Sequence, residues 1–104
     1  MGNWVSVMSA AGVREGEPIE CTISGWSIAL FRVGHDVFAT DSLCTHGAAR
    51  LCDGFQEGFA IECPLHQGRF DVRTGRCMSP PVTRELRVYP IRLVDGQIEI
   101  QLED

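Results

Sequence analysis

The fold is decided by Cys44-Thr45-His46 and Cys63-Pro64-Leu65-His66, two motifs that stand sixteen residues apart in the middle of the chain. In both motifs the cysteine comes before the histidine. Two loops that approach each other from opposite sides can therefore gather both sulfurs on one side and both imidazoles on the other. A single metal ion needs no such sorting, whereas a two-iron cluster with two Cys on one iron and two His on the other does. The motifs predict that Cys44, His46, Cys63 and His66 bind one [2Fe–2S] cluster.

A structural zinc site is the alternative for the same four side chains, because zinc also accepts two Cys and two His. Zinc modules usually place Cys with Cys and His with His in separate short motifs, and this chain mixes them. The zinc interpretation would make the protein a metal-stabilised binding module with no redox role.

The segment 41–81, which contains both motifs, is rich in Gly, Cys, His and Pro, and its strand signals at 60–62 and 69–72 are brief. A loop-rich insert of this length needs something to hold it together. Metal ligation would do so, because it offsets ordering entropy that a small core cannot. We therefore expect one domain over 1–104 with a cluster-binding subdomain at about 41–81.

Outside this segment the sequence indicates short β-strands separated by glycine-containing turns. Ser24-Gly25 and Asp95-Gly96 fit tight hairpins, and apolar and polar residues alternate over 97–102 as in a half-buried strand. The expected class is all-β, a small antiparallel sandwich or barrel. The predicted strands lie at 4–8, 19–23, 26–33, 37–40, 87–94 and 97–102, and the connection 9–18 leaves room for a helical turn.

The segment 39–81 resembles the cluster-binding region of Rieske proteins. Cys44-Thr45-His46-Gly47 and the nine-residue string CPLHQGRFD at 63–71 are similar to the motifs of small soluble Rieske ferredoxins. Those ferredoxins serve bacterial aromatic-ring-hydroxylating dioxygenases of the naphthalene and biphenyl type. Pro80-Pro81 resembles the proline loop that covers the cluster in that family, and the resemblance extends more weakly over the whole chain. It implies one Rieske [2Fe–2S] cluster on a small β-sandwich.

The resemblance also implies an electron carrier rather than an enzyme. Such a carrier takes single electrons from a flavin-containing, NAD(P)H-dependent reductase and passes them to a Rieske non-heme iron terminal oxygenase in the degradation of aromatic compounds. The chain is too short for its own flavin domain and has no G-x-G-x-x-G after a strand, so we expect no small-molecule substrate. An alternative with the same chemistry is the small Rieske subunit of another redox enzyme, such as a nitrite reductase.

Both partners are expected to approach the two histidines of the motifs, with Pro64, Leu65 and Pro80-Pro81 as an apolar rim. Nucleic acid and anionic membranes are poor candidates as partners, because 14 acidic and 9 basic residues give a net charge of −5. No apolar run approaches the ~20 residues that cross a bilayer, and the first residues lack a signal-peptide pattern. The predicted compartment is the cytoplasm.

The remaining cysteines are not expected to be ligands, and their odd total of five argues against a disulfide framework. Cys21 is expected to pack as a small hydrophobic residue in a strand. Cys52 and Cys77 are expected either as free thiols near the cluster or as a disulfide. His35, in Gly34-His35-Asp36, is expected in a turn.

The loops also bear on the reduction potential. High-potential Rieske proteins of respiratory and photosynthetic membranes carry an extra cysteine in each loop and hydroxyl groups bonded to the cluster sulfurs. Here neither Gly47-Ala48-Ala49 nor Leu65 supplies the cysteine, and Gln67-Gly68-Arg69 supplies no hydroxyl. Because hydrogen bonds to sulfur raise the potential, we expect a value near the low end of the Rieske range, about −150 mV.

Overall fold

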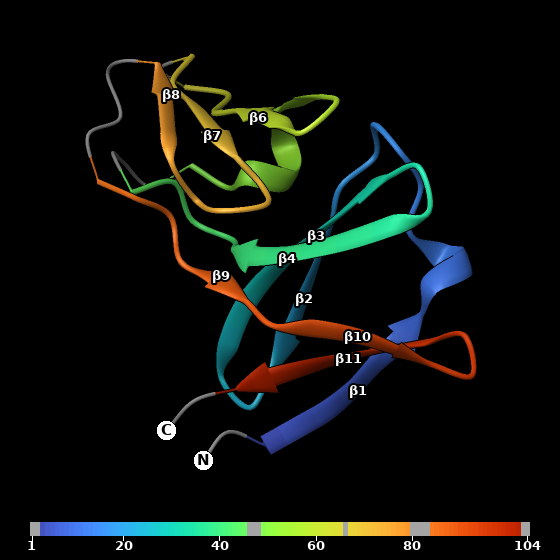
Figure 1. The fold of residues 1–104 in the computed structure, drawn as a ribbon. Helices are drawn as coiled ribbons and strands as arrows, with labels where there is room; N and C mark the ends of the chain where they lie inside the picture. The colour runs from blue at the N-terminus through green and yellow to red at the C-terminus, as the bar shows by residue number, and fades with distance from the viewer. Residues whose placement is uncertain (1–2, 46–48, 66, 80–83, 103–104) are drawn as a thin grey trace.

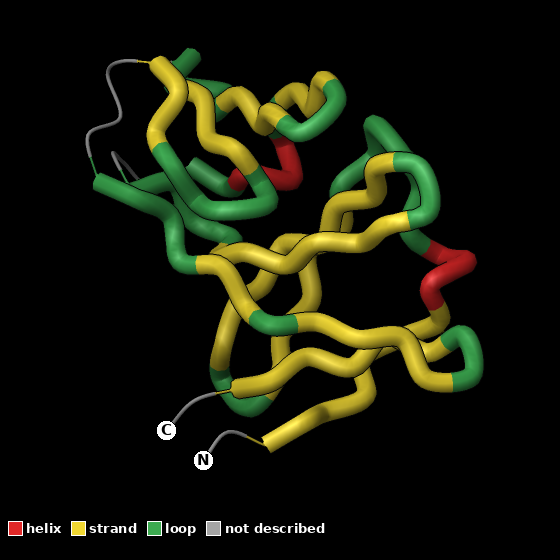
Figure 2. The backbone as a smooth tube through the Cα atoms, in the orientation of Figure 1, coloured by secondary structure: helices red, strands yellow, loops and turns green. Residues whose placement is uncertain are grey.

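The computed structural model describes residues 3–45, 49–65, 67–79 and 84–102. Strands dominate this part of the chain, and its only helices are two single 3-10 turns, η1 (Ala10–Gly12) and η2 (Leu51–Asp53) (Figure 2). None of the helices described here has the length or apolar character to cross a membrane. The all-β expectation is confirmed. The strands are β1 (Asn3–Ser9), β2 (Ile19–Ile23), β3 (Trp26–Val33), β4 (Asp36–Asp41), β5 (Phe55–Glu57), β6 (Ala60–Glu62), β7 (Arg69–Asp71), β8 (Cys77–Ser79), β9 (Val88–Tyr89), β10 (Ile91–Val94) and β11 (Gln97–Leu102).

The strands form three antiparallel sheets in the orders β1-β11-β10, β2-β3-β4-β9 and β5-β6-β7-β8. The first two sheets enclose one hydrophobic core and together form what we call the base. The third sheet, here called the cap, stands at one end of the molecule, and β1 and β11 lie at the other (Figure 1). The second motif lies in the loop between β6 and β7 of the cap, and the first motif begins three residues after the end of β4.

Strand β3 joins base and cap because it is buried on both faces. Ile28 and Leu30 belong to the base core, whereas Ala29 and Phe31 belong to a second core that lies against the cap. All four side chains are 0% exposed. Successive side chains of a strand point to opposite faces, so a strand covered on both sides becomes an unbroken apolar run. The sequence Ile-Ala-Leu-Phe at 28–31 is therefore what two stacked cores require.

The prediction of a single strand at 87–94 is wrong. The structure divides it at Pro90, so that β9 pairs with β4 in one sheet and β10 pairs with β11 in the other. Proline has no backbone N–H to donate to a ladder, which favours a break at this position. The Pro90 carbonyl accepts a hydrogen bond from the Gln101 N–H at 3.0 Å. The chain thus passes from one sheet to the other at this proline.

Three short elements were not predicted, namely η2, β5 and β8. Each has three residues, too few to show a periodic pattern, and the two strands are held by their neighbours β6 and β7. The strand predicted at 69–72 ends at Asp71, and the strands predicted at 4–8 and 37–40 extend by one residue at each end. The predicted strands at 19–23, 26–33, 60–62 and 97–102 are confirmed.

The Gln56 side chain ties the cap to the base. Its amide nitrogen donates to the carbonyl oxygen of Arg32 in β3 at 2.7 Å and to that of Gly58 at 3.2 Å. Its amide oxygen accepts the Gly16 N–H at 3.2 Å. One side chain therefore links β5 to β3 and to the connection that precedes β2.

Candidate functional site

Cys44 and Cys63 lie in the same hydrophobic core, between the cap and β3. The two residues are 4% and 0% exposed, and no disulfide links any of the five cysteines. A thiolate buried among apolar side chains is costly unless a cation balances its charge. Two thiols buried together are thus better suited to metal ligation than to attack on a substrate. Their apolar neighbours are Ala29, Phe31, Ala49, Leu51, Ile61, Phe70, Val72 and Leu86.

The two motifs form loops of the same construction. The Cys44 N–H donates to the Ala49 carbonyl at 2.9 Å, and the Cys63 N–H donates to the Gly68 carbonyl at 2.7 Å. Each cysteine thus opens a loop that is closed by the carbonyl five residues further on. In sequence, the histidine of each motif falls inside its loop. The shared construction fits a centre that takes ligands from both loops.

The structure brings together two of the four expected ligands. His46 and His66 lie outside the described residues, as do Gly47, Ala48 and Pro80-Pro81. Within the described part of the chain, no group of three or more His, Cys, Asp or Glu side chains is arranged to hold a metal ion. The assignment of all four ligands therefore remains a proposal.

Residues 84–87 lie close to the first loop and to the turn after β7. The Thr45 hydroxyl donates to the Arg84 carbonyl at 2.8 Å, and the Leu86 N–H donates to the Gly75 carbonyl at the same distance. Gly75 has a φ of +81°, and a Cβ added there would stand 1.9 Å from the Leu86 carbonyl oxygen. Sequence reasoning missed both contacts. Only the glycine itself, in Thr74-Gly75, was a possible signal.

Apolar side chains are exposed beside both loops. Pro64 and Leu65 of the second motif are exposed, as predicted, and Leu65 is 62% accessible. Leu43, directly before the first motif, is 53% accessible and was not predicted. These three residues give the described part of the site an apolar surface.

Ion pairs lie at both ends of the β6–β7 ladder, one end of which carries the second loop. Arg69, which follows that loop, pairs with Glu62 at 3.1 Å and with Glu57 at 3.7 Å. Arg73 pairs with Asp71 at 2.9 Å, and its side-chain hydrogen bonds hold the pKa of the Asp71 carboxyl below the ordinary value. Charges of both signs alternate here, so the charged surface is internally paired.

The other three cysteines and His35 lie outside the two motif loops. Cys21 lies in β2 against the base core, and burial raises the pKa of its thiol. Cys77 packs against the core that holds the two motif cysteines, whereas Cys52 lies 3.7 Å from a guanidinium nitrogen of Arg50. Since neither forms a disulfide, the free-thiol alternative holds for Cys52 and Cys77. His35 is exposed in a turn, as predicted.

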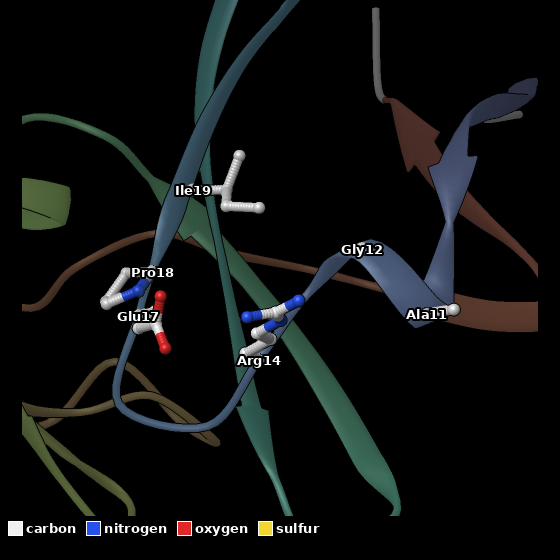
Figure 3. A pocket seen from close by; sticks show the side chains of 6 residues that line it. All are labelled: Ala11, Gly12, Arg14, Glu17, Pro18 and Ile19. Carbon is white, nitrogen blue, oxygen red and sulfur yellow. The ribbon is translucent and has the colours of Figure 1, made fainter.

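A groove of about 350 Å³ on the base has no residue of the two motifs in its lining (Figure 3). Arg14 and Glu17 form a small turn beside it, with the Glu17 N–H donating to the Arg14 carbonyl at 3.1 Å. Its described lining contains no cysteine or histidine and offers no metal ligand set. The lining residues are Ala11, Gly12, Arg14, Glu17, Pro18 and Ile19.

The chain matches a known family model, and it is similar to known proteins over nearly its whole length. Residues 3–90 match the family model of the Rieske [2Fe-2S] domain. The chain is 44% identical over 101 residues to the ferredoxin component of the naphthalene 1,2-dioxygenase/salicylate 5-hydroxylase systems of a Ralstonia species, covering 97% of each chain. It is similar to the solved ferredoxin of Sphingomonas yanoikuyae B1, with a TM-score of 0.92, 38% identity and coverage of 97% and 100%.

Two further solved structures bear on the expected partners. One is a chain of a complex of reduced oxygenase and oxidized ferredoxin in carbazole 1,9a-dioxygenase, with a TM-score of 0.89, 35% identity and coverage of 94% and 92%. The other is a putative nitrite reductase small subunit of Mycobacterium tuberculosis, with a TM-score of 0.84, 21% identity and coverage of 100% and 98%. At that identity the second likeness shows the fold alone.

Gly75→Ala should destabilise the protein far more than Gly58→Ala. Both glycines have positive φ, but a Cβ at Gly58 meets nothing within 4 Å, whereas one at Gly75 collides with the Leu86 backbone. We expect urea unfolding to show a loss of about 1 kcal/mol for Gly58→Ala and about 3 kcal/mol for Gly75→Ala. Equal losses would mean that the 84–87 segment is not held by this contact.

Proposed function

Because the chain belongs to the Rieske [2Fe–2S] domain family, we propose that Cys44 and Cys63 bind one iron of the cluster and that His46 and His66 bind the other. The observation that carries the proposal is the burial of both cysteines in one core, each at the start of a loop closed in the same way. A cluster ligated from both loops would neutralise the two buried thiolates.

The protein works as a ferredoxin of an aromatic-ring dioxygenase system, an electron carrier rather than an enzyme. The cluster, when bound, supplies one-electron oxidation and reduction. The chain's own residues hold the thiolates in an apolar core from which water is excluded. They also leave Leu43, Pro64 and Leu65 at the surface beside the loops.

We propose that a flavin-containing, NAD(P)H-dependent reductase delivers the electrons and that a Rieske non-heme iron oxygenase receives them, both at the exposed apolar surface of the loops. Small, brief contacts of this kind suit electron transfer, because rapid turnover needs rapid dissociation. We also propose the cytoplasm as the compartment, which five cysteines without a disulfide favour.

The proposed unit of function is one domain over 1–104 with its cluster-binding part at about 41–81. The cap sheet, from Phe55 to Ser79, falls inside that range and contributes the second loop. From the base, strand β3 contributes Ala29 and Phe31 to the core that holds both cysteines.

The purified protein is expected to be red-brown with two irons and two acid-labile sulfides per chain. Cys63→Ala should abolish both the colour and the iron, because one thiolate ligand is lost. The matched control is Cys77→Ala, which truncates a cysteine packed on the same core and should retain both. A colourless protein with one zinc per chain would contradict the binding of an iron–sulfur cluster.

A redox titration monitored by visible absorbance should give a midpoint near the low end of the Rieske range, about −150 mV. The reason is that the loop sequences supply neither the extra cysteines nor a hydroxyl after His66. A clearly positive midpoint would show that other donors reach the cluster sulfurs.

Leu65→Glu should slow electron transfer to the oxygenase by roughly tenfold, the effect of losing one well-placed apolar contact at an interface. Stopped-flow spectroscopy of the reduced protein mixed with oxygenase measures this rate. The control is Leu93→Glu, which places the same charge on β10, where Leu93 is 49% exposed. Equal rates for the two variants would locate docking elsewhere, and a changed visible spectrum in Leu65→Glu would make Leu65 structural.

A further inference from the structure

Glu20 lies on the side of the base that faces the cap. It stands directly opposite Ala29 of β3, and Ala29 stands opposite Thr40 of β4. Residues opposite each other in antiparallel strands project from the same face of the sheet. Since Ala29 belongs to the core that contains both motif cysteines, Glu20 shares the face that the cap covers. Its side chain keeps 20% of its surface exposed.

Both arms of the first loop reach this one carboxylate. The Ser42 hydroxyl donates to Oε2 of Glu20, and the Arg50 guanidinium pairs with Oε1. Ser42 precedes the first motif by two residues and is 0% exposed, and Arg50 directly follows the residue that closes the loop. The carboxylate thus connects the incoming arm, the outgoing arm and strand β2.

The two loops differ in what supports their stems. The second loop is framed by β6 and β7, whose ladder pairs Glu62 with Arg69 immediately outside the loop. The first loop is framed by an isolated bridge between Leu43 and Arg50, outside any strand, and by the Leu51 N–H, which donates to the Ser42 carbonyl at 2.8 Å. One bridge fixes a stem less firmly than a continuous ladder does. Glu20 adds a side-chain support from strand β2 that reaches both arms of this shorter stem.

We propose that Glu20 is a positioning residue for the cluster, because its carboxylate fixes the stem from which Cys44 reaches the iron. This inference rests on the proposed function, in which Cys44 is a ligand. The Cys44 N–H pairs with the Ala49 carbonyl, and both residues lie between Ser42 and Arg50. A stem released from Glu20 would let this pair, and the thiolate with it, move away from the core.

The ion pair between Glu20 and Arg50 predicts opposite effects of its two charges on the midpoint potential. Glu20 and Arg50 neutralise each other beside the first loop. Glu20→Gln leaves the cation unbalanced, which favours the reduced cluster and raises the potential. Arg50→Gln leaves the Glu20 carboxylate unbalanced, which disfavours the reduced cluster and lowers the midpoint potential. Loosening of the fold alone gives no reason for shifts of opposite sign.

The first test measures iron release from holoprotein to a chelator after the parent has been shown to contain two irons per chain. A parent without iron would refute the proposed function and would not concern Glu20. Glu20→Ala should release iron roughly tenfold faster than the parent, as expected for the loss of about one hydrogen bond of ordinary strength. Glu99→Ala is the matched control, because it removes a β11 carboxylate that pairs with Arg92 at 2.7 Å.

Glu20→Gln keeps the size of the side chain and an oxygen for Ser42, so it provides the test if Glu20→Ala does not fold. Its iron release should fall between those of the parent and Glu20→Ala. The midpoint potentials of Glu20→Gln and Arg50→Gln should move up and down, respectively. Equal iron release by Glu20→Ala and Glu99→Ala, or potentials that stay unchanged or move in the same direction, would overturn the proposal.

Discussion

The rest of the structure depends on burying two cysteines in a core that the cap cannot build alone. The cap consists of four three-residue strands, and these contribute Ile61 and Phe70 to the core around the cysteines. Strand β3 supplies the missing wall, since Ala29 and Phe31 face the cysteines while Ile28 and Leu30 face the base. Both cores therefore use the same strand, so the stability of the cap end of the molecule is tied to that of the base.

The features that could be predicted from the sequence are those with a regular local pattern. The longer base strands were predictable because their residues alternate or run apolar in a regular way, as in β11 and β3. The four proposed ligands stood out because cysteine and histidine recur in the same order at short spacing. Chemistry and periodicity are both local properties, so a single sequence reveals them.

The unpredicted features are those that depend on distant partners. Pro90 divides a run that looks continuous, because the two halves belong to sheets that meet only in three dimensions. The three-residue strands β5 and β8 exist through their neighbours. Gly75 matters because Leu86 lies against it, and the Thr45 hydroxyl because the Arg84 carbonyl is near. No local sequence pattern predicts contacts of this kind between residues that are distant in the chain.

The placement of β1 and β11 at the end opposite the cap has a practical consequence (Figure 1). A molecule held to a solid support through those strands would present the two motif loops outward, toward the solution. An electrode surface prepared in this way could exchange partner proteins freely. Attachment through the cap would instead bury the apolar patch around Leu65 against the support.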